Sequence, residues 1–243
     1  MSTERTLEKR KSMAEVAREI DKISSSAVQQ FEDAGDFEKE LVVATAVVDM
    51  RALLTPEIMA PVMALMNTDL GFRTDRDPKQ NDKAGRPLVP YSMDVVRDVF
   101  IESRLRGFHA VGNEFNIIAG RFYGCKNGFE RKVRELTKGT CEVSIDVPQM
   151  MGGTAKVKCR ATWAINGQKG DIGVRPEDPC EFLVRINEFM GPDGAIGKAQ
   201  RKLYQRIYSR LTGKSVPDGD AAEGSIEVSA SVTRQPGGAK HHE

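Results

Sequence analysis

The sequence predicts an α+β fold, and three patterns along it support that class. Apolar residues recur at helical spacing in the first part of the chain, alternate with polar residues between positions 141 and 186, and return to helical spacing between 194 and 211. Helices that precede and follow a run of neighbouring antiparallel strands are typical of this class. We therefore expect an antiparallel β-meander packed with helices.

Size and composition favour a soluble globular protein. The chain has 243 residues, of which 40% are hydrophobic and 29% are charged, so it is long enough to bury a substantial core. No apolar run approaches the roughly 20 residues that span a bilayer, and the charged N-terminus lacks the apolar segment of a secretory signal. Because the cysteines show no close spacing, we expect a reduced, cytoplasmic protein that does not enter a membrane.

Residues 1–38 form a charged segment with a thin helical stripe that includes Met13, Val16, Ile20 and Ile23. This stripe is too narrow to form a core of its own. The segment is therefore either a frayed arm or a helix that packs on a neighbouring subunit and supports oligomerisation. The pattern leaves both alternatives open.

The next part of the chain is predicted to be mainly helical. Residues 41–54 are strongly apolar and indicate a buried element. Thr55 and Pro56 then have the N-cap and N1 residue types that begin a helix. Residues 73–91 are rich in Asp, Lys, Asn, Gly and Pro without periodicity, which predicts a long mobile loop. Ser92 caps a further helix that ends near residue 106.

Strands begin after residue 111. Residues 115–119 and 121–123 are short β-prone runs. Asn127 resembles the N-cap of a capping box, which predicts a helix from this position. That helix has an apolar side and a basic side, and the basic side carries Arg131 and Arg134.

Residues 141–147 and 155–165 alternate apolar and polar side chains, as half-buried strands do. Asn166-Gly167 predicts a hairpin turn, and residues 168–174 and 180–186 continue the meander. The outward face of the second strand carries three cations two residues apart, which are Lys156, Lys158 and Arg160.

Residues 194–211 predict an amphipathic helix, with Ala199, Leu203 and Ile207 on its apolar side. The opposite side carries Lys198, Arg201, Lys202 and Arg206, and no acidic residue occurs between Lys198 and Lys214. Such a face is either simply solvated or bound to an external polyanion.

After residue 214 the composition shifts to Ser, Gly, Ala, Pro and Asp without an aromatic residue, so we expect a disordered tail. The chain then divides into a charged helical N-terminal arm at 1–38, a core at 39–214 and a disordered C-terminal tail at 215–243.

No pattern indicates catalysis or a bound cofactor. The run from Gly191 to Ala199 resembles a phosphate-binding loop, but it holds one residue too many, and Ala199 lacks the hydroxyl that would hold magnesium. Zinc sites need ligands at short spacing, whereas the cysteines are scattered and only His109 lies outside the tail. We therefore expect no enzyme, no metal site and no cofactor.

Three basic surfaces with aromatic residues nearby favour nucleic-acid binding instead. They are the region of Arg121, Tyr123 and Lys126, the strand with the three outward cations, and the last helix with Tyr204 and Tyr208. Lys and Arg contact phosphates without reading sequence, and aromatic rings stack on unpaired bases. The predicted ligand is therefore a single-stranded nucleic acid.

Two sequence runs and the meander between them resemble phage single-strand annealing proteins of the RecT type, a group of Redβ- and ERF-like recombinases. The first run is Arg104-Leu-Arg-Gly-Phe-His-Ala-Val-Gly-Asn-Glu-Phe-Asn-Ile-Ile-Ala-Gly-Arg-Phe-Tyr-Gly-Cys-Lys-Asn-Gly-Phe129, and the second is Gly197-Lys-Ala-Gln-Arg-Lys-Leu-Tyr204. The second run matches the family's Ala-x-Arg-Arg/Lys-Leu-aromatic pattern. The resemblance covers roughly residues 41–214.

This resemblance implies an annealase-like core that anneals complementary DNA strands without ATP in homologous recombination. It implies a homo-oligomeric ring or filament that holds phosphates in a basic groove between the sheet and a helix. It further implies single-stranded DNA and the annealed duplex intermediate as ligands, an exonuclease or single-strand-binding protein as a partner, and, for a phage-encoded protein, the bacterial host cytoplasm. The chain departs from the family at a loop at 148–153 and in its short tail, which leaves partner recruitment open.

We therefore expect a set of DNA-binding residues with no catalytic member. The alternatives are an oligomeric scaffolding protein whose basic faces bind acidic partners, and a phosphate-processing enzyme. The expected DNA contacts are Arg121, Tyr123, Lys126, Arg131, Arg134, Lys156, Lys158, Arg160, Lys198, Arg201, Lys202 and Arg206.

Overall fold

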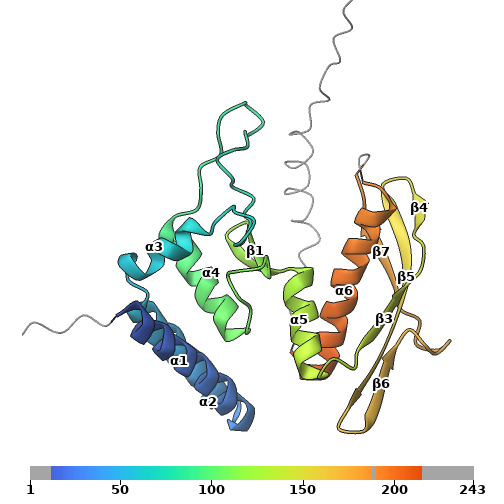
Figure 1. Cartoon of the computed structure of the whole chain (residues 1–243), viewed down its shortest axis with the longest axis horizontal. Coiled ribbons are helices and arrows are strands. Elements are labelled where there is room, and N and C mark those ends of the chain that lie inside the picture. The colour runs from blue at the N-terminus through green and yellow to red at the C-terminus, as the bar shows by residue number, and fades with distance from the viewer. Residues whose placement is uncertain (1–11, 188–189, 215–243) are drawn as a thin grey trace, which may run out of the picture. The chain divides into compact units, whose positions relative to one another are not determined.

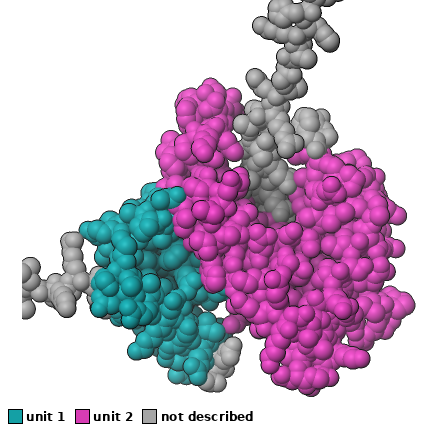
Figure 2. Space-filling model, in the orientation of Figure 1, with its two compact units in different colours: residues 1–64, 92–107 teal, residues 65–91, 108–243 magenta. Residues whose placement is uncertain are grey.

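A computed structural model describes residues 12–187 and 190–214. The first residues of the predicted arm and the whole predicted tail at 215–243 lie outside these ranges. The chain forms two compact units, one from residues up to 64 together with 92–107, and the other from 65–91 together with the residues from 108 onward. Figure 2 shows them in teal and magenta. The helices and antiparallel strands confirm the α+β class.

The first unit is helical. It consists of α1 (Met13–Asp33), α2 (Asp36–Leu53), α3 (Pro56–Ala64) and α4 (Met93–Leu105). A capping box between Ser12 and Glu15 begins α1. The predicted starts of α3 at Pro56 and of α4 after Ser92 are both confirmed.

Helix α1 packs on α2 and α4 of the same chain and buries Val16 and Ile20 there. Helix α1 is therefore not a frayed arm. Its packing on a neighbouring subunit stays a prediction. The thin apolar stripe is sufficient because α2 and α4 complete the core around it. The arm also has no boundary at residue 38, since α2 begins at Asp36.

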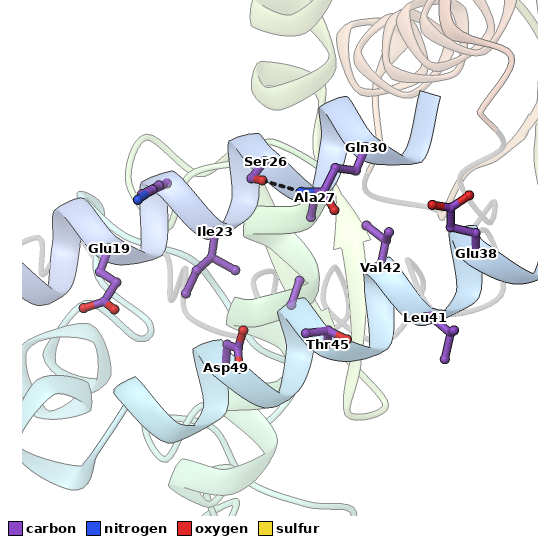
Figure 3. Close-up of a pocket in the computed structure, with 12 residues that line it drawn as sticks. Glu19, Ile23, Ser26, Ala27, Gln30, Glu38, Leu41, Val42, Thr45 and Asp49 are labelled. Carbon is purple, nitrogen blue, oxygen red and sulfur yellow. Dashed lines mark hydrogen bonds between the residues drawn. The ribbon is translucent and has the colours of Figure 1, made fainter. Parts of the chain in front are cut away.

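The apolar run at 41–54 is mostly a surface helix, which corrects the prediction of a buried element. Only Ala46 and Met50 are buried on α2, whereas Leu41 is 53% exposed and Val48 is 64% exposed. The reason is that α2 is apolar around much of its circumference, but α1 and α4 cover only part of it. Between α1 and α2 lies a groove of about 400 Å³ (Figure 3) into which Ile23 points.

The second unit begins with the segment predicted to be a mobile loop, and hydrogen bonds hold this segment in place. Tyr91 donates its hydroxyl to Asp75 Oδ1 at 2.7 Å, and Asp75 Oδ2 accepts the backbone N–H of Ala119 at 2.9 Å. The N–H of Gly120 donates to the Tyr91 hydroxyl at 2.8 Å. Ala119 and Gly120 form the turn between β1 (Phe115–Ile118) and β2 (Arg121–Gly124), so the segment is anchored to this hairpin.

Helix α5 (Lys126–Leu136) begins two residues before the predicted start, and its N-cap is Cys125. The Asn127 side chain is not a cap. It donates instead to the carbonyl oxygen of Gly112 at 3.0 Å, a contact that no local pattern encodes.

The sheet is organised around the long strand β5 (Thr154–Ile165). The first half of β5 pairs with β4 (Gln149–Met151) and β7 (Glu181–Arg185), and its second half pairs with β3 (Glu142–Ile145) and β6 (Gln168–Ile172). All these pairs are antiparallel, which confirms the predicted meander.

The turns of the sheet follow the sequence closely in one place and depart from it in another. Asn166 and Gly167 have φ values of 50° and 81° and join β5 to β6, as predicted. The predicted loop at 148–153 is instead strand β4 followed by a turn at Gly152 and Gly153. The edge formed by β3 and β4 contains one extra residue, because Ile145 pairs with Cys159 but Gln149 pairs with Lys156.

Helix α6 (Pro192–Thr212) covers one face of this sheet and also packs against α5 (Figure 1). Ala199, Leu203 and Ile207 are fully buried, which confirms the predicted apolar side. Helix α6 therefore lies between the sheet and α5, and this position determines which of its cations reach solvent.

Candidate nucleic-acid interface

The outward row of cations on β5 is confirmed. Ala155, Val157, Cys159, Ala161 and Trp163 are buried, whereas the residues that alternate with them are half-buried or exposed. Because neighbouring strand residues point to opposite faces, Lys156, Lys158 and Arg160 lie on the open face of the sheet.

Acidic residues on the same sheet face pair with two of these cations. Lys156 Nζ lies 2.9 Å from Glu181 Oε1. Arg160 Nη2 lies 2.5 Å from Asp146 Oδ1 and forms a second ion pair. Among the described residues, Lys158 forms no ion pair. The open face is therefore a mixed surface with one unpaired cation in the row.

The row on β5 and the last helix cannot line one groove, which corrects the expected arrangement. Helix α6 contacts β5, β7 and β3, and the buried side chains of β5 face it. The row therefore points away from α6, because side chains alternate along the strand. The two basic surfaces lie on different sides of the sheet.

Arg201 is a core residue and does not belong to the exposed face of α6. It is 5% exposed, its guanidinium lies 4.9 Å from the ring centroid of Tyr123, and its Nη1 donates to Gln205 Oε1 at 3.1 Å. Tyr123 is itself buried. Both residues were predicted to bind DNA, and both are buried, with Tyr123 of β2 packed against Arg201 of α6.

The exposed side of α6 carries four cations at intervals of four residues, which we call the basic ridge: Lys198, Lys202, Arg206 and Arg210. Residues four apart on a helix rise by about 6 Å and lie on nearly the same side. Arg210 replaces Arg201 in the predicted set. Its position four residues after Arg206 is the sequence signal that places it on the same side of the helix.

A carboxylate and two backbone oxygens of the described residues contact three of the ridge cations. Asp178 lies 3.8 Å from Arg206 Nη2 and 3.3 Å from Arg210 Nη1, so one carboxylate serves two arginines. Arg210 also donates to the backbone oxygen of Asp171 at 2.7 Å, and Lys198 donates to that of Arg185 at 2.9 Å. The ridge is therefore held in place at both ends.

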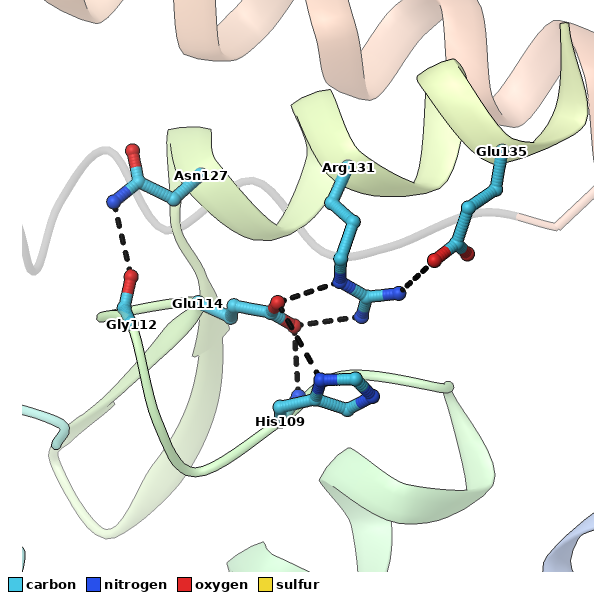
Figure 4. A network of polar contacts seen from close by, with 6 residues as sticks. All are labelled: His109, Gly112, Glu114, Asn127, Arg131 and Glu135. Carbon is cyan, nitrogen blue, oxygen red and sulfur yellow. Dashed lines mark hydrogen bonds and ion pairs between the residues drawn. The ribbon is translucent and has the colours of Figure 1, made fainter. Parts of the chain in front are cut away.

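Arg131 on α5 is fixed by an internal network (Figure 4). Its Nε and Nη2 donate to the two oxygens of Glu114 at 2.5 and 2.7 Å, and its Nη1 donates to Glu135 at 2.7 Å. Glu114 also accepts the backbone N–H of His109 at 2.8 Å. Hydrogen bonding to Glu114 raises the pKa of Arg131 above its ordinary value. Arg131 thus ties α5 to the segment before β1, which is a structural role.

The remaining predicted contacts are spread around the second unit. Arg121 is exposed beside the β1–β2 turn, and among the described residues it forms no ion pair. Arg134 is mostly exposed and lies 3.3 Å from Glu130. Lys126 Nζ lies 3.5 Å from Gln200 Oε1 on α6. Among the described residues, the ridge on α6 therefore joins the row on β5 as a second series of cations along one element.

The described residues offer no arrangement for metal chemistry or thiolate chemistry. Across 12–187 and 190–214, no three His, Cys, Asp or Glu residues are grouped to hold a metal ion. Burial raises the pKa of the Cys159 thiol to about 12 and raises that of Cys180 as well. Within the same ranges, no helix has the length and apolar content needed to cross a bilayer.

Comparisons with protein-family models, with curated proteins and with solved structures find no match to this chain.

Proposed function

We propose that the protein binds single-stranded DNA and anneals complementary strands without a nucleotide cofactor. The basic ridge on α6 is the observation that carries this proposal. Four cations at one-turn spacing form a track for a phosphate backbone, and contacts to phosphates do not depend on base sequence. A strand held by its phosphates keeps its bases available for pairing. The annealing step itself rests on the resemblance to RecT-type proteins.

The test combines an annealing assay with a salt titration of binding. Two complementary oligonucleotides, one carrying a fluorophore and the other a quencher, should anneal faster with the protein than without it, in the absence of ATP. The slope of log affinity against log salt reports the number of phosphates contacted, at about 0.7 per phosphate for single strands.

Double substitutions test whether the ridge makes the phosphate contacts that set the slope of log affinity against log salt. Lys202→Ala with Arg206→Ala removes two ridge cations and should lower the slope by about 1.4. The matched control is Arg18→Ala with Lys22→Ala, two exposed cations with the same spacing on α1, which should leave the slope unchanged. Equal slopes for both double variants would reject the ridge as the interface. A slope near zero for the unmodified protein would favour the scaffolding alternative with acidic protein partners.

Self-association is part of the proposal, because annealing by this class of protein needs adjoining subunits. The exposed apolar residues of α2 support it, since Leu41 and Val48 offer apolar surface that the chain itself does not cover. Leu41→Glu with Val48→Glu should shift the sedimentation coefficient toward that of a monomer. An unchanged coefficient would exclude this helix as the contact.

A further inference from the structure

The basic ridge leads to a pocket at the C-terminal end of α6. The pocket has a volume of about 360 Å³ and lies between the last turns of α6 and the β5–β6 hairpin. Arg210 belongs both to the ridge and to the pocket wall. A ligand that follows the ridge therefore reaches the pocket without leaving the basic surface.

The lining of the pocket combines three kinds of chemistry. Trp163 and Leu211 supply apolar surface, Arg210 supplies positive charge, and Asn166 and Gln168 supply amide groups at the hairpin. Trp163 is 7% exposed, so only a small part of its surface is open to the pocket. A small, flat, polar-edged group with a phosphate attached matches this combination in size and chemistry.

The indole of Trp163 is held rigidly by its neighbour across the strands. Trp163 pairs with Gly170 on β6, and a Cβ on Gly170 would lie 2.5 Å from the indole Nε1. Only glycine allows the β6 backbone to approach the ring this closely. The apolar wall of the pocket is therefore fixed before any ligand arrives, which reduces the ordering cost of binding.

We propose that this pocket is a subsite for one unpaired nucleotide of the bound strand. Arg210 holds its phosphate, while its base rests against Trp163 and Leu211 within reach of the Asn166 and Gln168 amides. This inference rests on the proposed function, because the ridge must deliver the strand. It adds one base-contacting position to an interface that otherwise contacts only phosphates.

Trp163 provides its own reporter, because it is the only tryptophan in the chain. The full-length protein is titrated with a fluorescein-labelled oligo-dT while fluorescein anisotropy and, in a parallel unlabelled titration, indole emission are recorded. We expect anisotropy to rise and indole emission to change with the same midpoint. A second oligonucleotide with the same number of phosphates but abasic sites should bind about tenfold more weakly.

A double variant separates direct contact from a remote effect. Gln168→Ala with Lys169→Ala alters two exposed hairpin residues and should abolish the difference between the base-containing and abasic oligonucleotides. The Arg18→Ala, Lys22→Ala protein should behave like the unmodified chain. If the double variant keeps both the emission change and the preference for bases, the subsite is overturned.

The remaining outcomes distinguish the two proposals. A rise in anisotropy with constant indole emission overturns the subsite and leaves strand binding intact. No rise in anisotropy, with the protein shown to be folded, overturns strand binding and the subsite with it. An emission change with polyglutamate but not with oligo-dT would also overturn the subsite and assign the pocket to an acidic protein partner.

Discussion

The ion pair between Glu114 and Arg131 should show strong energetic coupling when either partner is replaced. The Glu114 side chain is 9% exposed and that of Arg131 is 25% exposed, and their two contacts are 2.5 and 2.7 Å long. Removing one partner of a buried pair typically costs about 3–5 kcal/mol, because the other charge stays buried without compensation. Since Arg131 is partly exposed, we expect about 2–4 kcal/mol for either single change.

The perturbation is a double-mutant cycle of Glu114→Gln and Arg131→Met. The double variant should lose less than the sum of the single losses, with a coupling of about 1–3 kcal/mol. Urea unfolding followed by the emission of Trp163, which lies in the same unit, measures the free energy of unfolding. Additive losses would refute the pairing. The salt slope of DNA binding provides a second check, because a fall of about 0.7 in folded Arg131→Met would restore Arg131 as a phosphate contact.

Other substitutions and titrations test the packing and the buried groups. Gly128→Ala should destabilise the protein by about 1–3 kcal/mol, because its new Cβ would lie 2.5 Å from Phe108 Cε1. Gly197→Ala in α6 should instead stabilise the protein by about 0.5–1 kcal/mol, because no atom lies within 4 Å of the new Cβ. Urea unfolding measures both variants, and a change in the free energy of unfolding with the same sign for both would contradict this packing. Burial raises the pKa of Cys159 to about 12, so iodoacetamide at pH 8 should modify this thiol in urea but not in the native protein. Mass spectrometry measures the modification, and equal reaction of both forms would contradict the burial of Cys159. Burial also raises the pKa of Tyr91 above its ordinary value of 10.0. The folded state thus holds the hydroxyl proton of Tyr91 more tightly than the unfolded state. The contribution of this group to the free energy of unfolding is therefore fully present below pH 10 and is lost as the pH rises through the pKa of the folded state. Tyr91→Phe should remove that pH dependence, and an unchanged profile would count against it.

Features set by local chemistry could be predicted from the sequence. The alternation along β5 identified the buried and outward side chains, because strand geometry has a period of two. The turn at Asn166 and Gly167 followed from the need for positive φ at both positions. The starts of α3 and α4 followed from Pro56 and Ser92. In each case the residues that determine the structure are adjacent in the chain.

Features set by contacts between distant segments could not be predicted in the same way. Arg201 belongs to the basic side of an isolated helix, yet in the fold it is buried and Tyr123 of the β1–β2 hairpin packs against it. The segment at 73–91 has a loop-like composition, but Asp75 and Tyr91 fix it to a turn that lies 28 or more residues further along the chain. Periodicity shows which side of an element is apolar but not how many sides will be covered.

The separation of the two basic surfaces determines where binding energy should arise. On the open sheet face, Lys156 and Arg160 each have a carboxylate partner, so a phosphate would have to compete with that partner. On the ridge, Arg206 and Arg210 share the carboxylate of Asp178, so a phosphate can add a second anion to this pair of arginines. The proposed strand should thus follow α6. Lys158→Ala on the open face should leave the salt slope nearly unchanged, and a fall as large as that caused by removing one ridge cation would show that the strand crosses the sheet instead.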